Sequence, residues 1–558
     1  MVSQARAGTA PSAMSSWVAP TLVTLGAFLF YLINIDDGLL IHDEAYHILA
    51  ARGLIATGEP RIAEGFYTRG LLYTRLVALS LSLFGDSLGA ARLPAAVAMA
   101  LTAGLLFAWL RQVAEARAAW LGAGLFAVSP FSLLSAQFVR FYALQSLLFL
   151  VGALCVYGIM TAGTEGRRRI LLALVALLAL AGAVNLQDTT LLGVLAIGIW
   201  VTAIFCLPLL ADPAGRRWQI LAMGAGVVVT LLLLLFLWSN ATLGGLWEKY
   251  RWTPVFNEAN ENKFWYYHAQ YILYYPTLWT LSGILAVLAL AKFPRPGWFL
   301  LTIFAVGFIL NSAAGPKSIR YIAYAQPFLF GLWGLGLAAL WPLVARAVGE
   351  VGDRLTAGIL LPSPWNRRIA SILGIGAMLF LLLANPFWLR SLTLLADVTI
   401  PPELPDTRWE LAHKDLQPWL DKAAIVVAVG DVEPLYAYGR YDLAFSPSKL
   451  SEIDPEERHD FGRDFRTGRR IIGTPESLER VIECYPSGLF MVPVSRWDRA
   501  THAGREVVDV LNKDATPLKL PPKSGLIAYV WEHPDTAPSA AAACGELPEL
   551  GLPALTPR

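Results

Sequence analysis

Long apolar stretches separated by short polar segments make up most of the chain. Each apolar stretch runs to roughly 20 residues, which is the length that an α-helix needs to cross the hydrocarbon core of a bilayer. We therefore predict a polytopic membrane protein, mainly α-helical, with about eleven transmembrane helices. The predicted spans cover residues 17–35, 88–110, 118–136, 139–160, 169–187, 190–210, 217–238, 271–291, 297–312, 320–345 and 368–389. The first of these is long for a signal peptide and has no convincing cleavage site, so we interpret it as a retained span.

Composition agrees with this interpretation. Of the 558 residues, 56% are hydrophobic and only 15% are charged, whereas a soluble protein carries about 25% charged residues. The 19 Trp and 19 Tyr residues fit the aromatic belts found at membrane interfaces. Membrane lipids are therefore expected partners. The net charge of +2 carries no information about nucleic acid. The sequence has no basic patch interleaved with aromatic residues, and this argues against nucleic acid as a partner.

The placement of Lys and Arg predicts the topology, because cytoplasmic loops carry an excess of both. With residues 1–16 in the cytoplasm, the bias holds on every alternate loop. An odd number of spans then places the chain beyond residue 390 outside, at a bacterial inner (plasma) membrane. The cytoplasmic connections hold Arg111, Arg117, Arg167, Arg168, Arg169, Arg216, Arg217, Lys292, Arg295, Arg346, Arg354, Arg367 and Arg368, whereas the short outer connections hold only Arg140, Lys317 and Arg320.

Two outer segments are long enough to carry structure of their own. Within the outer loop 36–87, residues 44–56 and 71–84 have apolar positions at helical spacing and are expected to lie on the membrane surface. Residues 395–535 are predicted to form a periplasmic (extracellular) soluble α/β domain, because strand-like and helix-like segments alternate there. The strand candidates are 423–429, 489–494 and 525–531, the helix candidate is Pro475–Cys484 with Thr474 as its N-cap, and residues 536–558 are predicted to be disordered.

Four cysteines divide between the two kinds of sequence. Cys155 and Cys206 lie in apolar runs and are expected to be inert core residues. Cys484 and Cys544 lie in the polar tail, where an outer location would allow them to pair, although no spacing rule supports pairing.

The acidic pair Asp43-Glu44 follows the first predicted span and opens a surface helix. One interpretation is a general base that deprotonates an acceptor hydroxyl or amine, or a ligand for a divalent cation. The other is a solvated helix start, where the dipole favours acids. Glu44 and His47 have a spacing that can share a metal, so Asp43, Glu44 and His47 are the metal candidates. A solvent-facing or capping histidine is the favoured interpretation of His47, and the need for a divalent cation is left open.

Basic residues begin two later spans at the same face. Arg140 opens the fourth span, and Lys317 with Arg320 opens the tenth. Such groups can clamp a phosphate in the headgroup zone, or they can extend toward lipid phosphates with no further role. The spans themselves are nearly free of charge at mid-depth, which argues against an ion-coupled transporter. In the tail, the acids and aromatics of 429–440 are interpreted as turn and packing residues rather than as a carbohydrate site.

Several of these motifs together resemble the GT-C superfamily of polytopic glycosyltransferases. The resemblance is to the protein O-mannosyltransferase family and the bacterial lipid A aminoarabinose transferases, and it covers about residues 17–390. Members of these families carry a DE or D-containing motif after the first span, then a short Gly turn and Arg-Leu-Pro, then a basic residue and Arg-Tyr opening a later span. The matching stretches are His42-Asp43-Glu44-Ala45-Tyr46-His47, Phe84-Gly85-Asp86-Ser87, Arg92-Leu93-Pro94 and Lys317-Ser318-Ile319-Arg320-Tyr321.

The resemblance implies a polyprenyl-phosphate-linked sugar as donor, with transfer at the outer face. It implies that Asp43 is the catalytic base or orients the acceptor, with Glu44 beside it in the same motif. It assigns Arg320, with Lys317 nearby, to the donor phosphate, and Arg69 can add to that clamp. One departure concerns the stretch 140–145, which lacks the acid that relatives often carry after the Arg that opens the fourth span.

We therefore expect an integral membrane glycosyltransferase (hexosyl- or pentosyltransferase) that acts on a lipid, glycan or protein acceptor. The alternatives are a flippase or transporter for lipid-linked saccharides, and a receptor or scaffold that uses the tail as its binding module.

Overall fold

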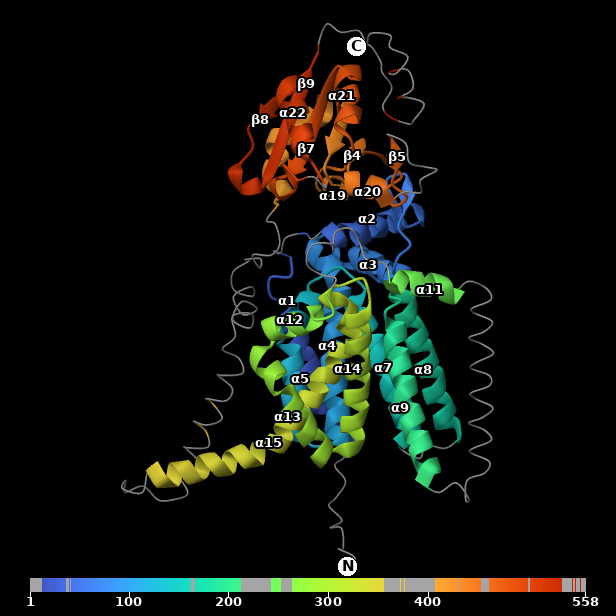
Figure 1. Ribbon diagram of the computed structural model, residues 1–558, viewed down its shortest axis with the longest axis vertical. Helices are drawn as coiled ribbons and strands as arrows, with labels where there is room; N and C mark the ends of the chain where they lie inside the picture. The colour runs from blue at the N-terminus through green and yellow to red at the C-terminus, as the bar shows by residue number, and fades with distance from the viewer. Residues whose placement is uncertain are drawn as a thin grey trace, which may run out of the picture. The chain divides into compact units, whose positions relative to one another are not determined.

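The computed structural model describes residues 13–36, 40, 42–161, 166–211, 242–251, 263–355, 372, 376, 407–430, 432–452, 461–499, 502–533, 544, 547 and 552. These residues form two compact units (Figure 1). One unit, here called the helical unit, is drawn from residues 1–33, 93–137 and 141–397. The other, here called the sheet unit, is drawn from 34–92, 138–140 and 398–558. The outer loop and the C-terminal domain are therefore parts of one unit.

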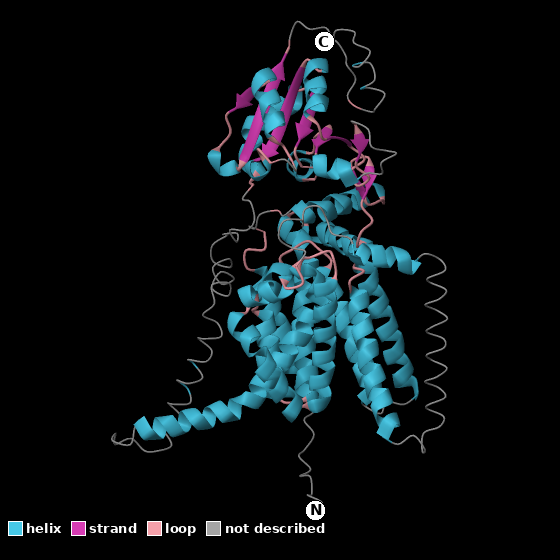
Figure 2. Ribbon diagram, in the orientation of Figure 1, coloured by secondary structure: helices cyan, strands magenta, loops and turns pink. Residues whose placement is uncertain are grey.

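The helical unit consists of long apolar helices and short connections (Figure 2). Its helices are α1 (Ala13–Leu32), most of α4 (Leu88–Val113), α5 (Ala116–Ala127), α6 (Pro130–Ala136), α7 (Tyr142–Thr161), α8 (Gly166–Leu186), α9 (Thr190–Ala211), α11 (Thr242–Arg251), α12 (Tyr266–Tyr274), α13 (Pro276–Lys292), α14 (Pro294–Ala313), the 3₁₀ helix η3 (Ile319–Ala325) and α15 (Gln326–Leu355). Helices α7, α8 and α9 lie side by side.

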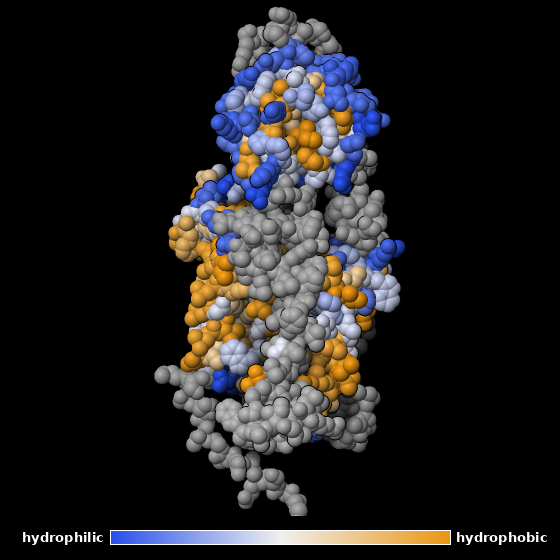
Figure 3. All heavy atoms as spheres, turned by 90° about the vertical axis from the view of Figure 1, so that its left-hand side faces the viewer, coloured by the Kyte–Doolittle hydropathy of each residue, from blue (hydrophilic) through white to orange (hydrophobic). Residues whose placement is uncertain are grey.

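Among the described residues, five helices are long and apolar enough to cross a membrane, or six if one bent pair is counted as a span. Hydrophobic side chains gather over the face of the helical unit seen in Figure 3, as expected for a lipid-facing surface. The chain is thus a multi-pass membrane protein. The predicted spans 217–238 and 368–389 lie almost wholly outside the described residues, so the number eleven stays a prediction.

Two predicted spans are broken by proline. Residues 118–136 were expected to form one helix, but α5 and α6 are separate and bent by 57°. Pro130 lacks the N–H that a continuous helix needs, and Ser129 caps the new helix by accepting a hydrogen bond from the Ser132 amide at 3.2 Å. Pro276 starts α13 in the same way, directly after α12. The prediction of continuous helices at these places was wrong.

Helix α15 packs closely against two neighbours because glycines remove the side chains between them. A Cβ atom on Gly334 would lie 2.6 Å from the Cα of Gly122 in α5. A Cβ atom on Gly336 would lie 2.4 Å from the carbonyl oxygen of Leu285 in α13. Small residues at such crossings let helix backbones approach, which is how helices associate in membranes.

The sheet unit contains a seven-stranded sheet in the order β5-β6-β4-β3-β7-β9-β8. The four strands β6, β4, β3 and β7 are parallel to one another. Strand β5 runs antiparallel to β6, β9 runs antiparallel to β7, and β8 runs antiparallel to β9. The strands are β3 (Ile425–Ala428), β4 (Leu443–Phe445), β5 (Gly462–Arg463), β6 (Arg470–Ile472), β7 (Ser487–Pro493), β8 (Thr516–Leu518) and β9 (Leu526–Glu532). The three strand candidates of the sequence correspond to β3, β7 and β9, and are confirmed.

Helices of the C-terminal domain flank this sheet, and the outer loop adds helices of its own. The C-terminal helices are η4 (Trp409–Ala412), α18 (His413–Lys422), α19 (Glu433–Tyr438), α20 (Pro447–Glu452), α21 (Pro475–Cys484), η5 (Val494–Arg496), α22 (Arg505–Asp514) and η6 (Pro522–Ser524). The outer loop forms α2 (His42–Thr57), the hairpin β1 (Arg61–Ile62) and β2 (Gly65–Phe66), and α3 (Leu71–Phe84). Both predicted helices of this loop are confirmed as helices.

Alternate side chains of β3 enter two separate hydrophobic cores, as the strand period of two requires. Ile425 and Val427 share a core with residues of α21 and α22. Val426 and Ala428 share the other core with Ala45, Tyr46 and further residues of the outer loop. One face of the sheet is therefore completed by a segment almost 400 residues earlier in the chain.

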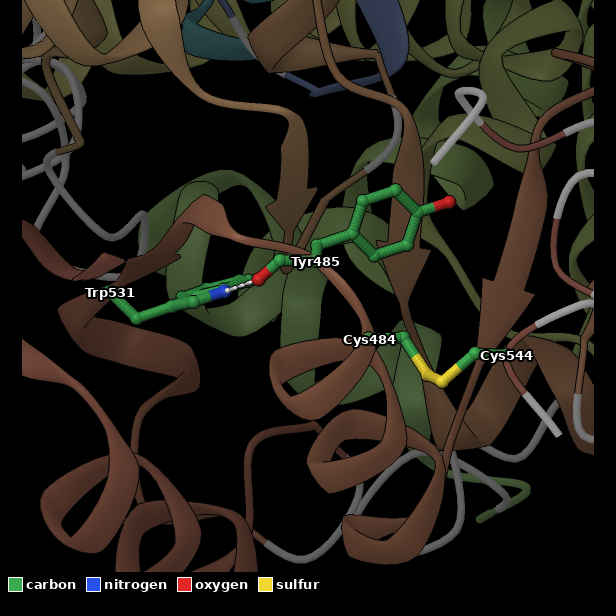
Figure 4. Close-up of a disulfide and its surroundings, with 4 residues drawn as sticks. All are labelled: Cys484, Tyr485, Trp531 and Cys544. Carbon is green, nitrogen blue, oxygen red and sulfur yellow. Dashed lines mark hydrogen bonds between the residues drawn. A yellow bond between two sulfur atoms is a disulfide. The ribbon is translucent and has the colours of Figure 1, made fainter. Parts of the chain in front are cut away.

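The end of α21 is tied to a more distant segment by a disulfide (Figure 4). Cys484 is bonded to Cys544, which resolves the pairing that spacing left open. Beside it, the indole N–H of Trp531 donates to the carbonyl oxygen of Tyr485 at 3.1 Å. The helix begins as predicted, with Pro475 in its first turn and the Thr474 hydroxyl accepting a hydrogen bond from the Ser477 amide at 3.2 Å.

Candidate active site

The candidate site is built on the first turn of α2, where the two acids of the motif lie. Acidic groups are favourable there because the N-terminal end of a helix carries partial positive charge. The carboxylates nevertheless differ in environment. The side chain of Glu44 is fully buried, whereas 26% of the Asp43 side chain is exposed. Asp43 is therefore the acid of the pair that another molecule can reach.

Glu44 joins three segments of the sheet unit. It forms a two-pronged ion pair with Arg92, with nitrogen–oxygen distances of 2.9 and 2.8 Å. It also accepts a hydrogen bond from the backbone N–H of Val139 at 2.9 Å. Arg92 in turn donates to the carbonyl oxygen of Ile35 at 3.1 Å. Both oxygens of Glu44 are engaged, so this carboxylate holds α2 against residues 138–140 and the start of α4.

Asp43 faces Arg140, with 3.6 Å between Oδ2 and Nη2. Arg140 is itself buried, and its Nη1 donates to the hydroxyl oxygen of Tyr67 at 2.8 Å. The guanidinium therefore lies between a partly exposed carboxylate and a phenol. This arrangement places a fixed positive charge beside a group that can accept a proton.

His47, one helical turn beyond Asp43, is buried among aromatic rings. Its Nδ1 lies 2.9 Å from the hydroxyl of Thr74, and its ring meets the edges of Tyr67 and Tyr73. Burial holds the pKa of His47 well below its usual value, and the charges of Arg140 and Arg69 lower this pKa further against the opposing effect of Asp43. His47 is thus a neutral packing residue near neutral pH. The expectation of a solvent-facing or capping histidine was wrong, because the aromatic residues of 67–73 enclose it.

Lys317 and Arg320 belong to the helical unit. The ammonium group of Lys317 donates to the carbonyl oxygens of Asn311 at 3.2 Å, Ser312 at 2.6 Å and Ala314. It thereby caps the end of α14, and burial lowers its pKa to about 8. Arg320 lies over the ring of Tyr142, 5.8 Å from its centre. The phosphate-binding role of these two residues stays a prediction.

The metal candidates do not form a recognisable cation site. Among the residues that the structure describes, no group of three or more His, Cys, Asp or Glu side chains could hold a metal ion. Glu44 and His47 are directed to Arg92 and Thr74. The need for a divalent cation stays untested.

Comparison with known proteins rests on structure alone. No protein-family model matches the sequence, and no curated protein matches it. The fold is similar to that of ArnT from Cupriavidus metallidurans in the apo state, with a TM-score of 0.58 and 16% identity over 93% of this chain and 98% of that one. ArnT from the same organism bound to undecaprenyl phosphate gives a TM-score of 0.59 and 15% identity, with the same coverage. At this level of identity, the likeness shows that the chain shares the fold of ArnT.

Sequence reasoning missed several residues that build the site. Arg92 lies in a motif of the resemblance but had no predicted role, and Tyr67 was not predicted at all. Arg92 binds Glu44, and Tyr67 binds Arg140. Thr74 carried no signal beyond its place in a surface helix. Glu433 was interpreted as a turn residue, yet it pairs with His42 at 2.8 Å. Sequence separation hides such partners, because neither periodicity nor spacing reports contacts between distant segments.

Proposed function

We propose that this protein is an integral membrane glycosyltransferase. It moves a sugar from a polyprenyl-phosphate donor to a lipid, glycan or protein acceptor at the outer face of a bacterial inner membrane. The observation that carries the proposal is the reachable carboxylate of Asp43 beside the buried guanidinium of Arg140. The shared fold with ArnT, which has been solved with undecaprenyl phosphate bound, supports the donor class.

The chemistry requires a base, a phosphate partner and a defined geometry between them. Asp43 takes the proton of the acceptor hydroxyl or amine, the acceptor atom forms a bond to the anomeric carbon, and the bond from that carbon to the phosphate oxygen breaks. The polyprenyl phosphate leaves with a second negative charge, which a fixed guanidinium stabilises. Arg140 is suited to this task, and Arg69 adds positive charge to the same region. Lys317 and Arg320 of the helical unit stay candidates for binding a donor phosphate, as the family resemblance implies.

A sugar phosphodiester is already activated, so no nucleotide site is needed. The C-terminal domain, whose central strands are parallel, has no Gly-rich phosphate loop in its sequence. In the described part of the helical unit, Lys317 is the single buried charged side chain. An ion-coupled transporter keeps ionisable groups within its spans, so this distribution favours an enzyme over a transporter.

The test uses purified full-length protein in detergent or nanodiscs. Undecaprenyl-phosphate-linked hexoses and pentoses are supplied one at a time, and released undecaprenyl phosphate is measured with EDTA and with added Mg²⁺. We expect at least one donor to be consumed. We expect Asp43→Asn to reduce consumption by about a hundredfold or more, the size of effect seen when a general base is removed.

Asp86→Asn is the matched control, because Asp86 is an exposed acid of the same loop that pairs with Arg52. It should keep wild-type turnover. Full activity of Asp43→Asn would exclude Asp43 as the base. Consumption of no donor by the wild-type protein, together with movement of labelled lipid between leaflets, would favour the flippase instead.

A further inference from the structure

The C-terminal domain contacts α2 at two residues, one on each side of Asp43 in the sequence. His42 precedes Asp43 in the chain, and Tyr46 lies one helical turn after His42 on the same side of the helix. Both side chains contact residues of the C-terminal domain. The contacts lie within the sheet unit, whose segments share one hydrophobic core.

The first contact lies at the point where the strand order of the sheet reverses. Strand β3 has β4 on one side and β7 on the other, and parallel sheets hold their ligands beyond the carboxyl ends of the strands at such a point. Here Glu433, which follows β3, pairs with Arg496, which follows β7, at 3.0 Å. The other oxygen of Glu433 lies 2.8 Å from Nδ1 of His42. The location that often holds a ligand thus holds the first residue of α2.

The second contact leads from the C-terminal domain to Arg140. The hydroxyl oxygen of Tyr46 accepts hydrogen bonds from Arg466 at 3.1 Å and Lys449 at 3.3 Å. The ring of Tyr46 stacks on Tyr67, with 5.1 Å between ring centres. Tyr67 then accepts a hydrogen bond from Arg140, which faces Asp43. An unbroken series of contacts connects Arg466 to the two candidate catalytic groups.

A close contact between two loops joins the outer loop to the C-terminal domain. The backbone N–H groups of Glu64 and Gly65 donate to the carbonyl oxygen of Thr467 at 3.0 and 2.9 Å. A Cβ atom on Gly65 would lie 2.5 Å from the carbonyl oxygen of Arg466, and one on Gly468 would lie 2.7 Å from Glu64. Glycine is therefore required on both sides, and the β1–β2 hairpin fits closely against the loop before β6.

We propose that the C-terminal domain is a working part of the active site, with Glu433 and Arg466 as positioning residues for Asp43 and Arg140. Glu433 acts through His42 on the first turn of α2, and Arg466 acts through Tyr46 and Tyr67 on Arg140. This inference rests on the proposed glycosyl transfer. It gives the domain a role other than that of a separate acceptor-binding module.

Removing Glu433 and removing Arg466 should have different kinetic effects. Both are measured per folded molecule, with the undecaprenyl-phosphate sugar that the wild-type protein consumes. Glu433→Ala should lower kcat by about tenfold to a hundredfold, the range expected when a catalytic group is misplaced, with the donor KM nearly unchanged. Glu433→Gln should recover most of that loss, because it keeps the length of the side chain and its contact with His42. Arg466→Ala should mainly raise the donor KM, because Arg140 is the proposed phosphate partner.

Lys422→Ala is the control for the kinetic series. Lys422 belongs to the same domain and forms an exposed pair with Glu532, so this variant should keep both wild-type constants. A merely structural role for Glu433 and Arg466 would reduce the folded fraction but leave kcat and KM of the folded molecules unchanged. That result would overturn the proposal.

Hydrogen exchange of α2 separates this proposal from the proposed function. Peptides covering residues 42–57 should exchange faster in Glu433→Ala and Arg466→Ala than in wild type or Lys422→Ala, while peptides of α8 stay unchanged. Wild-type exchange in both variants would overturn the positioning role whatever the kinetics show. If the wild-type protein consumes no donor, the proposed function fails. Faster exchange in Glu433→Ala and Arg466→Ala would then still support the conclusion that the C-terminal domain holds α2 in place.

Discussion

Asp43 and Glu44 are neighbours in the sequence, yet they meet different surroundings. Successive residues of an α-helix point roughly 100° apart, so one side chain of the pair turns into the protein and the other stays near its edge. Glu44 points inward and binds Arg92 and the backbone N–H of Val139. The outward group faces Arg140. The division of roles between the two acids follows from this geometry.

Removing either member of the Glu44–Arg92 pair should destabilise the protein strongly. Glu44→Gln or Arg92→Met leaves the other charge buried without its counter-ion, and such changes cost about 3–5 kcal/mol. We expect a clear fall in the thermal unfolding midpoint and in folded yield. The double variant Glu44→Met/Arg92→Met should lose less than the sum of the two single changes.

Asp86→Asn provides the comparison for this pair, because Asp86 is exposed and forms a surface ion pair with Arg52 that is worth about 0–1 kcal/mol. Its unfolding midpoint should stay close to that of the wild type. Equal midpoints for Asp86→Asn and the two buried-pair variants would show that Glu44 and Arg92 contribute no more than surface charges.

His47 should make the folded state sensitive to acid. Burial holds its pKa well below the usual value in the folded protein, whereas the unfolded chain has a pKa of about 6.5. Below that pH the unfolded state takes up a proton that the folded state does not. The free energy of unfolding therefore falls as the pH is lowered from about 6.5 toward the folded-state pKa, and the contribution of His47 is fully present above pH 6.5. His47→Gln should lose less of its unfolding midpoint between pH 7 and pH 5 than the wild type.

His413 is exposed on the C-terminal domain, so His413→Gln should show the wild-type loss over the same interval. A wild-type loss in His47→Gln would instead assign the acid sensitivity to other groups.

At the scale of elements, the disulfide between Cys484 and Cys544 makes a quantitative prediction. It closes a loop of 60 residues between the end of α21 and a distant segment, and a crosslink of this kind contributes about 2–4 kcal/mol by restricting the unfolded chain. Cys484→Ser, Cys544→Ser and the double variant should all lower the unfolding midpoint of the C-terminal domain by the same amount. Unequal losses would mean that the serines disturb packing rather than remove a crosslink.

Reducing agent should shift the wild-type protein to the same midpoint and leave Cys484→Ser/Cys544→Ser unchanged. This comparison separates the crosslink from Cys155, which is a free thiol in the helical unit.

Sequence patterns predicted the individual elements well where the pattern is local. The helices α2 and α3, the three central strand candidates and the capped start of α21 follow from periodicity and from Thr474-Pro475. The breaks before Pro130 and Pro276 were missed because hydropathy was given more weight than the missing proline N–H. The pairing partners of Glu44 and Glu433 could not be predicted, because they depend on segments brought together only by the folded chain.

At the scale of the whole molecule, three separate segments combine into the sheet unit. Residues 34–92, 138–140 and the C-terminal domain form it together, whereas the sequence suggested an outer loop attached to the spans and an independent tail. The loop contributes apolar residues to one face of the sheet. The candidate site is therefore carried by a unit whose parts are far apart along the chain, and changes in the C-terminal domain can reach Asp43.

Undecaprenyl phosphate should stabilise the complete protein if the proposed donor class is right. The molecule is the leaving group of the proposed reaction, so it can bind without any sugar chemistry. A ligand present at 100 times its dissociation constant adds about 2.7 kcal/mol to the stability of the state that it binds. We expect a dose-dependent rise in the unfolding midpoint with undecaprenyl phosphate and none with undecaprenol, because the phosphate is the group that Arg140 would bind. Arg140→Gln should weaken this rise, whereas Lys422→Ala should keep it. An equal response to the alcohol and the phosphate would reduce the effect to general lipid binding and would count against a phosphate site.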